Sequence, residues 1–127
     1  MAIFTIYQNH SCRKHHADIN KLGWMKAGEA HHGIRVHLFV AIERKEWMPE
    51  YFRAYKPVAS AAILGTNKNI DNDLERVFGA GNDHLEGMDE YVNFDKAHSI
   101  SVGDLVRSAA GDFYLVAGMG FKKVDIA

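Results

Sequence analysis

The strongest constraint on this fold is a nine-residue run, residues 34–42, with an apolar side chain at every second position. Apolar residues at every second position alternate with Arg35, His37, Phe39 and Ala41, the apolar set being Ile34, Val36, Leu38, Val40 and Ile42. A period of two places every second side chain on the same side of an extended chain. The run therefore predicts a β-strand with one face on a core and the other half exposed.

Other segments have the same character at the two ends of the chain. Ala2–Tyr7 alternates in the same way and predicts a first strand. The segment Tyr51–Leu64 is rich in aromatic and small apolar residues and suits either a strand or a helix; we expect a strand over residues 54–63. The tail predicts a β-meander, with strands over Ser99–Val106, Phe113–Ala117 and Phe121–Val124 separated by turns at residues 109–112 and at Gly118 and Gly120.

Two segments are typical of short helices. Asp71–Phe78 begins with acidic residues, which favour the positive end of a helix, and Gly79 follows as a natural stop. Arg13–Ala27 has helical spacing but contains Gly23, so we expect an interrupted helix there. Several hairpin-scale strands with one or two short helices predict an α+β fold with an antiparallel sheet of about four to six strands.

Length and composition limit the class of protein. The chain has 127 residues, 47% hydrophobic and 24% charged, which is typical of one globular domain, and we expect a single domain over 1–127 with a polar, His-rich insertion at about 9–33. No apolar run reaches the roughly 18 residues of a membrane span, and the first residues do not resemble a signal peptide. The one cysteine excludes an internal disulfide, so we expect a cytoplasmic protein.

Two linked motifs mark the second half of the chain. One is Leu74-Glu75-Arg76-Val77-Phe78 with Asn82; the other is Ser99-Ile100-Ser101-Val102-Gly103-Asp104-Leu105-Val106, continued by Tyr114-Leu115-Val116 and Gly120-Phe121-Lys122-Lys123-Val124. Together they resemble the YodL-like small proteins of phages, plasmids and integrative elements, over roughly residues 54–125. The resemblance implies a mobile-element accessory protein in the cytoplasm of a host cell, acting on a host or defence component. It implies no shared catalytic residues, and the motifs themselves read as scaffold.

The N-terminal third concentrates the residues that bind metals. Six of the eight histidines lie between residues 10 and 37, together with the only cysteine. Zinc is held by cysteine and histidine in tetrahedral sets, so we consider a zinc site whose candidate ligands are His10, Cys12, His15 and His16. The alternative is a solvated loop whose histidines cluster without a metal and which needs no cofactor.

Catalytic arrangements are less well supported by the pattern. Cys12 beside His10 or His15 has the residue types of a thiol enzyme. Ser99, Ser101 and Asp104 with His98 have those of a hydrolase triad, but along one predicted strand they point to opposite faces. The sequence therefore favours a non-enzymatic protein, with a metal-binding or thiol enzyme as the alternative.

Charge is distributed unevenly along the chain. Residues 1–56 carry nine Lys and Arg against five acids, whereas residues 57–127 carry six against eleven. Within residues 71–95 only Arg76 opposes eight acids, which are Asp71, Asp73, Glu75, Asp83, Glu86, Asp89, Glu90 and Asp95. A dense acidic surface steers basic partners. Combined with the context that the resemblance implies, these acids lead us to expect a protein-interaction module that inhibits a host or defence protein. The alternative is a solvated face that keeps the protein in solution.

Nucleic acid is a less favoured partner. The basic N-terminal stretch contains Trp24, which offers a stacking surface beside phosphate-binding cations. The excess of basic residues over residues 9–37 is small for a nucleic-acid-binding patch.

Overall fold

The computed structural model describes residues 2–63, 69–80, 82 and 90–127, and it divides the chain into two compact units. The sheet unit consists of the described residues of 2–8 and 57–124. The helical unit consists of residues 9–56 and 125–127. It interrupts the sheet unit after the first strand, so the segment between the first two strands is longer than the expected insertion at about 9–33.

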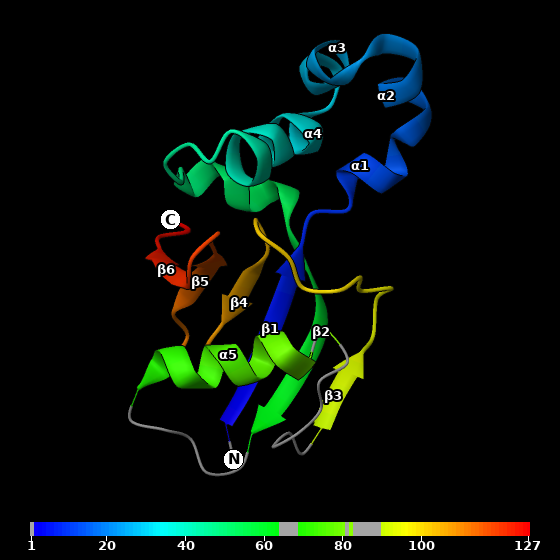
Figure 1. The fold of residues 1–127 in the computed structure, drawn as a ribbon. Helices are drawn as coiled ribbons and strands as arrows, with labels where there is room; N and C mark the ends of the chain where they lie inside the picture. The colour runs from blue at the N-terminus through cyan, green and yellow to red at the C-terminus, as the bar shows by residue number, and fades with distance from the viewer. Residues whose placement is uncertain (1, 64–68, 81, 83–89) are drawn as a thin grey trace. The chain divides into compact units, whose positions relative to one another are not determined.

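The sheet unit is built on a six-stranded sheet with the order β3-β2-β1-β4-β5-β6. Neighbouring strands run antiparallel, and the direction of β1 against β2 can be followed in Figure 1. The strands are β1 (Ala2–Gln8), β2 (Lys56–Ile63), β3 (Glu90–Asn93), β4 (Leu105–Arg107), β5 (Phe113–Val116) and β6 (Phe121–Val124). The predicted α+β class and antiparallel sheet are confirmed.

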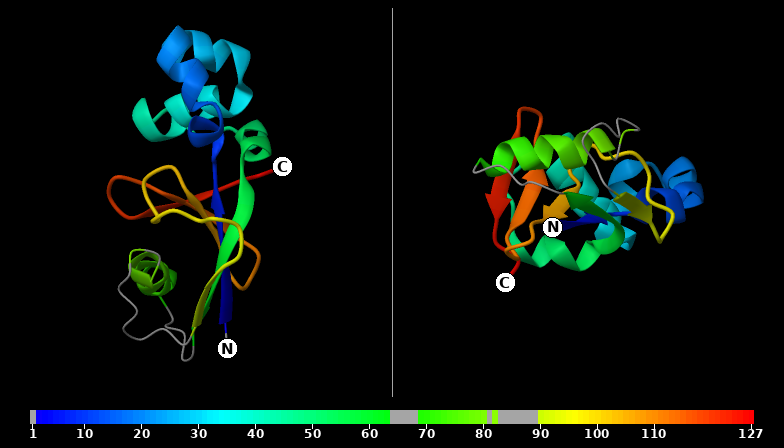
Figure 2. Two further views of the ribbon diagram at one scale, coloured as in Figure 1. Left: turned by 90° about the vertical axis from the view of Figure 1, so that its right-hand side faces the viewer. Right: turned by 90° about the horizontal axis from the view of Figure 1, so that it is seen from below.

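Helix α5 (Ile70–Ala80) covers one face of this sheet and closes the core. Figure 2 (left) shows α5 nearly end-on, on one side of the strands. Its Leu74 and Val77 are fully buried against Phe4 and Ile6 of β1 and against residues of β2, β4 and β5. Asp71 and Asp73 occupy the first turn, where the positive end of the helix stabilises acids. The helix continues through Gly79, the expected stop, to Ala80.

The helical unit consists of short helices packed around a small apolar centre. Ile19, Ala27 and Ile34 are buried there, with Cys12 and Leu38 packed against them. The helices are α1 (Ser11–Lys14), α2 (His16–Leu22), α3 (Trp24–Ala30), α4 (His32–His37), the π-helix η1 (Leu38–Ile42) and the 3₁₀-helix η2 (Pro49–Ala54). The described residues therefore hold more helices than the one or two expected.

The predicted strand over residues 34–42 is wrong, because α4 and η1 occupy these positions. In a helix, residues two apart point to nearly opposite sides, and residues four apart to nearly the same side. Ile34 and Leu38 face the centre formed by Ile19 and Ala27, whereas Val36 lines a pocket with Tyr51 on another side. A helix covered on two sides thus reproduces the alternation that predicts a strand.

Two further predictions need correction, and one strand was not predicted. The interrupted helix over Arg13–Ala27 is three helices, broken at His15 and at Gly23, whose φ of +83° suits glycine. The predicted strand Ser99–Val106 is irregular up to Asp104 and enters β4 only at Leu105. Strand β3 was not expected from the pattern.

Among the described residues, no helix has both the length and the apolar character needed to cross a bilayer.

Candidate functional site

Three metal-binding side chains converge where the short helices of the helical unit join. His15 lies between α1 and α2, Asp18 lies in the first turn of α2, and His31 lies between α3 and α4. One nitrogen or oxygen atom from each of the three lies within 4.8 Å of those from the other two. The helix breaks at His15 and His31 therefore bring together residues that are sixteen positions apart.

Direct contacts hold this cluster together. His31 Nε2 lies 2.7 Å from Asp18 Oδ2, and the rings of His15 and His31 stack with centroids 3.6 Å apart and planes 10° apart. The hydrogen bond from His31 is the main cause that lowers the pKa of the Asp18 carboxyl. The carboxyl is therefore ionised at neutral pH and can act as a ligand. The side chain of Asp18 is 46% exposed, so an ion can reach the cluster from solvent.

The donor set fits a transition metal of borderline softness. Two imidazoles and one carboxylate bind Zn²⁺ in many proteins and leave a fourth position open. Bond lengths of about 2.0–2.1 Å in a tetrahedral site separate neighbouring ligand atoms by about 3.3 Å. The 2.7 Å contact between His31 and Asp18 would open slightly around an ion, and the stacked rings of His15 and His31 would turn so that the nitrogen lone pairs, which lie in the ring planes, point at it.

Of the four residues predicted as zinc ligands, only His15 belongs to this cluster. Cys12 packs against the apolar centre, and burial raises the pKa of its thiol. A protonated, half-buried thiol is a poor ligand and a poor nucleophile. His16 is exposed beside Asn20, and His10 lies before α1, so neither joins the group in the part of the chain that the structure describes.

Sequence reasoning missed Asp18 and did not place His31 with His15. The usable signal was the spacing of His15 and Asp18, because residues three apart share a helix face. The pairing of His31 with them is set by the turn between α2 and α3 and carries no local pattern.

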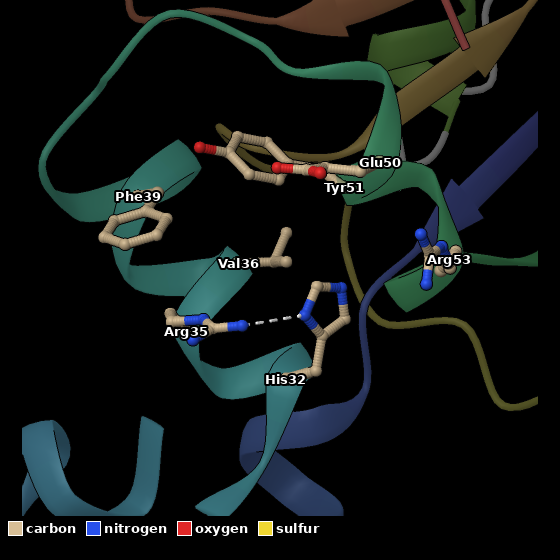
Figure 3. Close-up of a pocket in the computed structure, with 7 residues that line it drawn as sticks. All are labelled: His32, Arg35, Val36, Phe39, Glu50, Tyr51 and Arg53. Carbon is tan, nitrogen blue, oxygen red and sulfur yellow. Dashed lines mark hydrogen bonds between the residues drawn. The ribbon is translucent and has the colours of Figure 1, made fainter. Parts of the chain in front are cut away.

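A second feature of the helical unit is a pocket of about 340 Å³ between α4, η1 and η2 (Figure 3). Polar side chains rim the pocket, and the rings of Phe39 and Tyr51 lie 6.0 Å apart. The residues that line it are His32, Arg35, Val36, Phe39, Glu50, Tyr51 and Arg53. No sequence motif points to it, because its two halves come from separate helices.

The predicted acidic surface is only partly described. Asp71 and Glu75 are exposed one turn apart on α5, whereas Asp73 is buried, 3.8 Å from Arg76, and so lies off the surface. Asp95 is half-buried. Asp83, Glu86 and Asp89 and the side chain of Glu90 lie outside the described residues. The inhibitory interaction through these acids stays a prediction.

The segment from His98 to Asp104 has a structural role, because hydrogen bonds join it to Gln8 of β1. Asp104 Oδ2 accepts hydrogen bonds of 3.0 Å from both Gln8 Nε2 and the Ser101 N–H, and Gln8 also bonds the backbone of His98. Gln8 and Asp104 are buried, whereas the side chain of Ser101 is exposed. These residues tie the irregular segment to β1.

The aromatic residue considered for nucleic-acid binding is exposed at the start of α3. Trp24 is 46% exposed, and its ring lies 6.1 Å from that of His37. Lys21 and Lys26 flank it on the surface. Nucleic-acid binding here stays a prediction.

Comparison with known proteins found no match among family models, curated proteins or solved structures. The resemblance to YodL-like proteins therefore rests on the motif residues alone. Several of these residues have structural contacts: Ile100 and Val116 lie in the core of the sheet unit, and Asn82 Nδ2 bonds the carbonyl groups of Phe78 and Ile100.

Proposed function

We propose that the helical unit binds one divalent transition-metal ion, with Zn²⁺ as the first candidate, through His15, Asp18 and His31. The observation that supports this proposal most directly is the convergence of their three donor atoms within 4.8 Å. Metal binding would connect the α1–α2 junction with the α3–α4 junction. An ion held there stabilises helices that are each too short to be stable alone.

A hydrogen bond within the cluster occupies one of the donor atoms of the proposed site. The 2.7 Å contact between His31 and Asp18 requires a proton on the His31 ring nitrogen. A metal ion that takes His31 Nε2 as its ligand needs the lone pair of that nitrogen, so binding would replace this hydrogen bond, with the ring proton moved to Nδ1 or released.

Titration of untagged protein with Zn²⁺ is expected to show one equivalent bound and a higher melting temperature. Asp18→Asn or His31→Gln is expected to weaken binding at least about 100-fold, because even outer-shell partners of metal ligands contribute 10–100-fold. His16→Gln is the matched control, since this neighbouring histidine is exposed outside the cluster, and it should leave the affinity unchanged. The measurements are calorimetry and the visible spectrum of the Co²⁺ form.

Two outcomes would contradict the proposal. One is an empty protein at equimolar Zn²⁺ in the micromolar range. The other is binding that survives in Asp18→Asn but is lost in Cys12→Ser or His16→Gln, which would return the site to the ligands predicted from the sequence.

A further inference from the structure

We propose that the pocket between α4, η1 and η2 binds a small molecule that carries both a phosphate monoester and a ring system, as a mononucleotide does. Two guanidinium groups and an imidazole meet an apolar wall there (Figure 3). All the residues concerned belong to the helical unit, and the inference does not depend on the metal site.

The cationic rim is built by helix geometry. His32 and Arg35 lie three residues apart on α4, so they share a face, and Arg53 reaches the same pocket from η2. Among the described residues, neither arginine takes part in an ion pair. Two exposed guanidinium groups beside one pocket make a favourable site for a doubly charged oxyanion, which accepts bidentate hydrogen bonds from each.

The imidazole supplies a further donor. Arg35 Nη2 lies 3.5 Å from His32 Nδ1, and a guanidinium can only donate. His32 Nδ1 is then the acceptor, and the ring proton of the neutral form lies on Nε2. That N–H is available to a phosphate oxygen.

The other wall of the pocket is apolar and aromatic. Val36 and Tyr51 are buried, and Phe39, from the π-helix η1, is half-buried with its ring beside that of Tyr51. The π-helical geometry is recorded by the 2.8 Å bond from the Glu43 N–H to the Leu38 carbonyl, and π-helical turns are frequent at functional sites. This wall suits the ring portion of a ligand.

The remaining features agree with a small phosphorylated compound. Burial raises the pKa of the Tyr51 hydroxyl, so this group adds no negative charge to the pocket at neutral pH. Glu50 is the only acid among the lining residues and can accept hydrogen bonds from hydroxyl or amino groups of the ligand. A volume of about 340 Å³ lies within the range of small-molecule sites.

The test is calorimetric titration of the full chain with AMP, ribose 5-phosphate and adenosine. We expect AMP to bind most tightly, ribose 5-phosphate to bind more weakly, and adenosine not to bind. Arg35→Gln and Arg53→Gln should each weaken AMP binding about 10–100-fold, because hydrogen bonds to charged groups are the strong ones. Arg13→Gln is the control, since Arg13 is exposed on α1 outside the pocket, and it should have no effect.

Three results would overturn the inference: no binding of AMP, equal binding of AMP and adenosine, or AMP binding that is unchanged in both pocket variants. A nucleic-acid chain carries the same phosphate and ring groups as AMP. An oligonucleotide titrated with and without a 5′-phosphate therefore distinguishes a nucleic-acid ligand from a mononucleotide. Tight binding of both oligonucleotides with none of AMP would replace the small-ligand pocket by a surface for a nucleic-acid backbone. The variants are expected to fold because both arginines are exposed, which their circular dichroism and melting temperatures check.

Discussion

Replacing Asp104 with asparagine is expected to stabilise the protein at neutral pH and to leave its stability nearly unchanged at pH 4. Burial raises the pKa of the Asp104 carboxyl from 3.8 to about 6, and the Ser101 N–H, the charge of His98 and the Gln8 amide offset only part of that rise. The folded protein therefore keeps a proton that the unfolded chain has already lost between these pH values. Stability falls as pH rises through this window and stays level above about pH 6.

The size of the effect follows from the difference between the two pKa values. A shift of about two units corresponds to about 3 kcal/mol of unfolding free energy lost between pH 4 and pH 7. Asparagine carries no charge, and its side-chain oxygen can still accept from Gln8 and Ser101. The variant should therefore lack this fall and be more stable than the original protein at pH 7.

Urea denaturation at a series of pH values measures this directly. Asp112→Asn is the matched control, because Asp112 is 45% exposed and its nearest cation, Lys123, lies 3.7 Å away. An exposed ion pair of this kind contributes about 1 kcal/mol or less. Destabilisation by Asp104→Asn at pH 7 would contradict the expectation. It would show that the hydrogen bonds from Gln8 and Ser101 stabilise the ionised form of Asp104.

Gly33→Ala is expected to destabilise the helical unit by about 2 kcal/mol or more, although alanine favours helices. A Cβ at residue 33 would overlap Ser11 Oγ and lie 2.6 Å from Ser11 Cβ. It would also disturb the 2.7 Å bond from Asn9 Nδ2 to the Gly33 carbonyl. Overpacking of this kind typically costs about 1–3 kcal/mol, and the preference of a helix for alanine offsets at most about 1 kcal/mol.

Two controls make this expectation specific. Gly28→Ala, also in a helix, meets its nearest atom, Leu38 Cδ1, at 3.4 Å and should be neutral or stabilising. Ser11→Gly removes both clashing atoms, so the double variant Ser11→Gly/Gly33→Ala should recover most of the stability lost by Gly33→Ala. The free energy of unfolding of the original protein and of each variant is measured by chemical denaturation, followed by the helical circular dichroism signal. Equal losses for the two glycine substitutions, or no recovery in the double variant, would contradict the contact.

The strands near the two ends of the chain were predictable, and in β1 the side chains alternate between a buried and a more exposed face. The segment Ala2–Tyr7 corresponds to β1 (Ala2–Gln8), and Phe121–Val124 coincides with β6. The turn at residues 109–112 joins β4 to β5 as expected, with Gly111 at a φ of +96°. Local pattern and turn chemistry suffice where a strand pairs with its neighbour in the sequence.

The residues of the candidate metal site could be predicted only in part from the sequence. The concentration of histidines in the N-terminal third pointed to the region of this cluster and to one of its residues, His15. Sequence spacing did not reveal that Cys12 turns into an apolar centre while Asp18 and His31 meet, because both facts depend on how α2 and α3 fold back on each other.

The sequence by itself determined the α+β class, the antiparallel strands near both ends of the chain and the segment in which the candidate metal ligands gather. Only the tertiary structure decided the state of residues 34–42, where Ile34 and Val36 are buried on different sides of one helix. An apolar residue at every second position is compatible with a strand that has one buried face and also with a helix that is packed on two sides. Contacts between segments distant in the sequence select between these states, as they select the partners of His15.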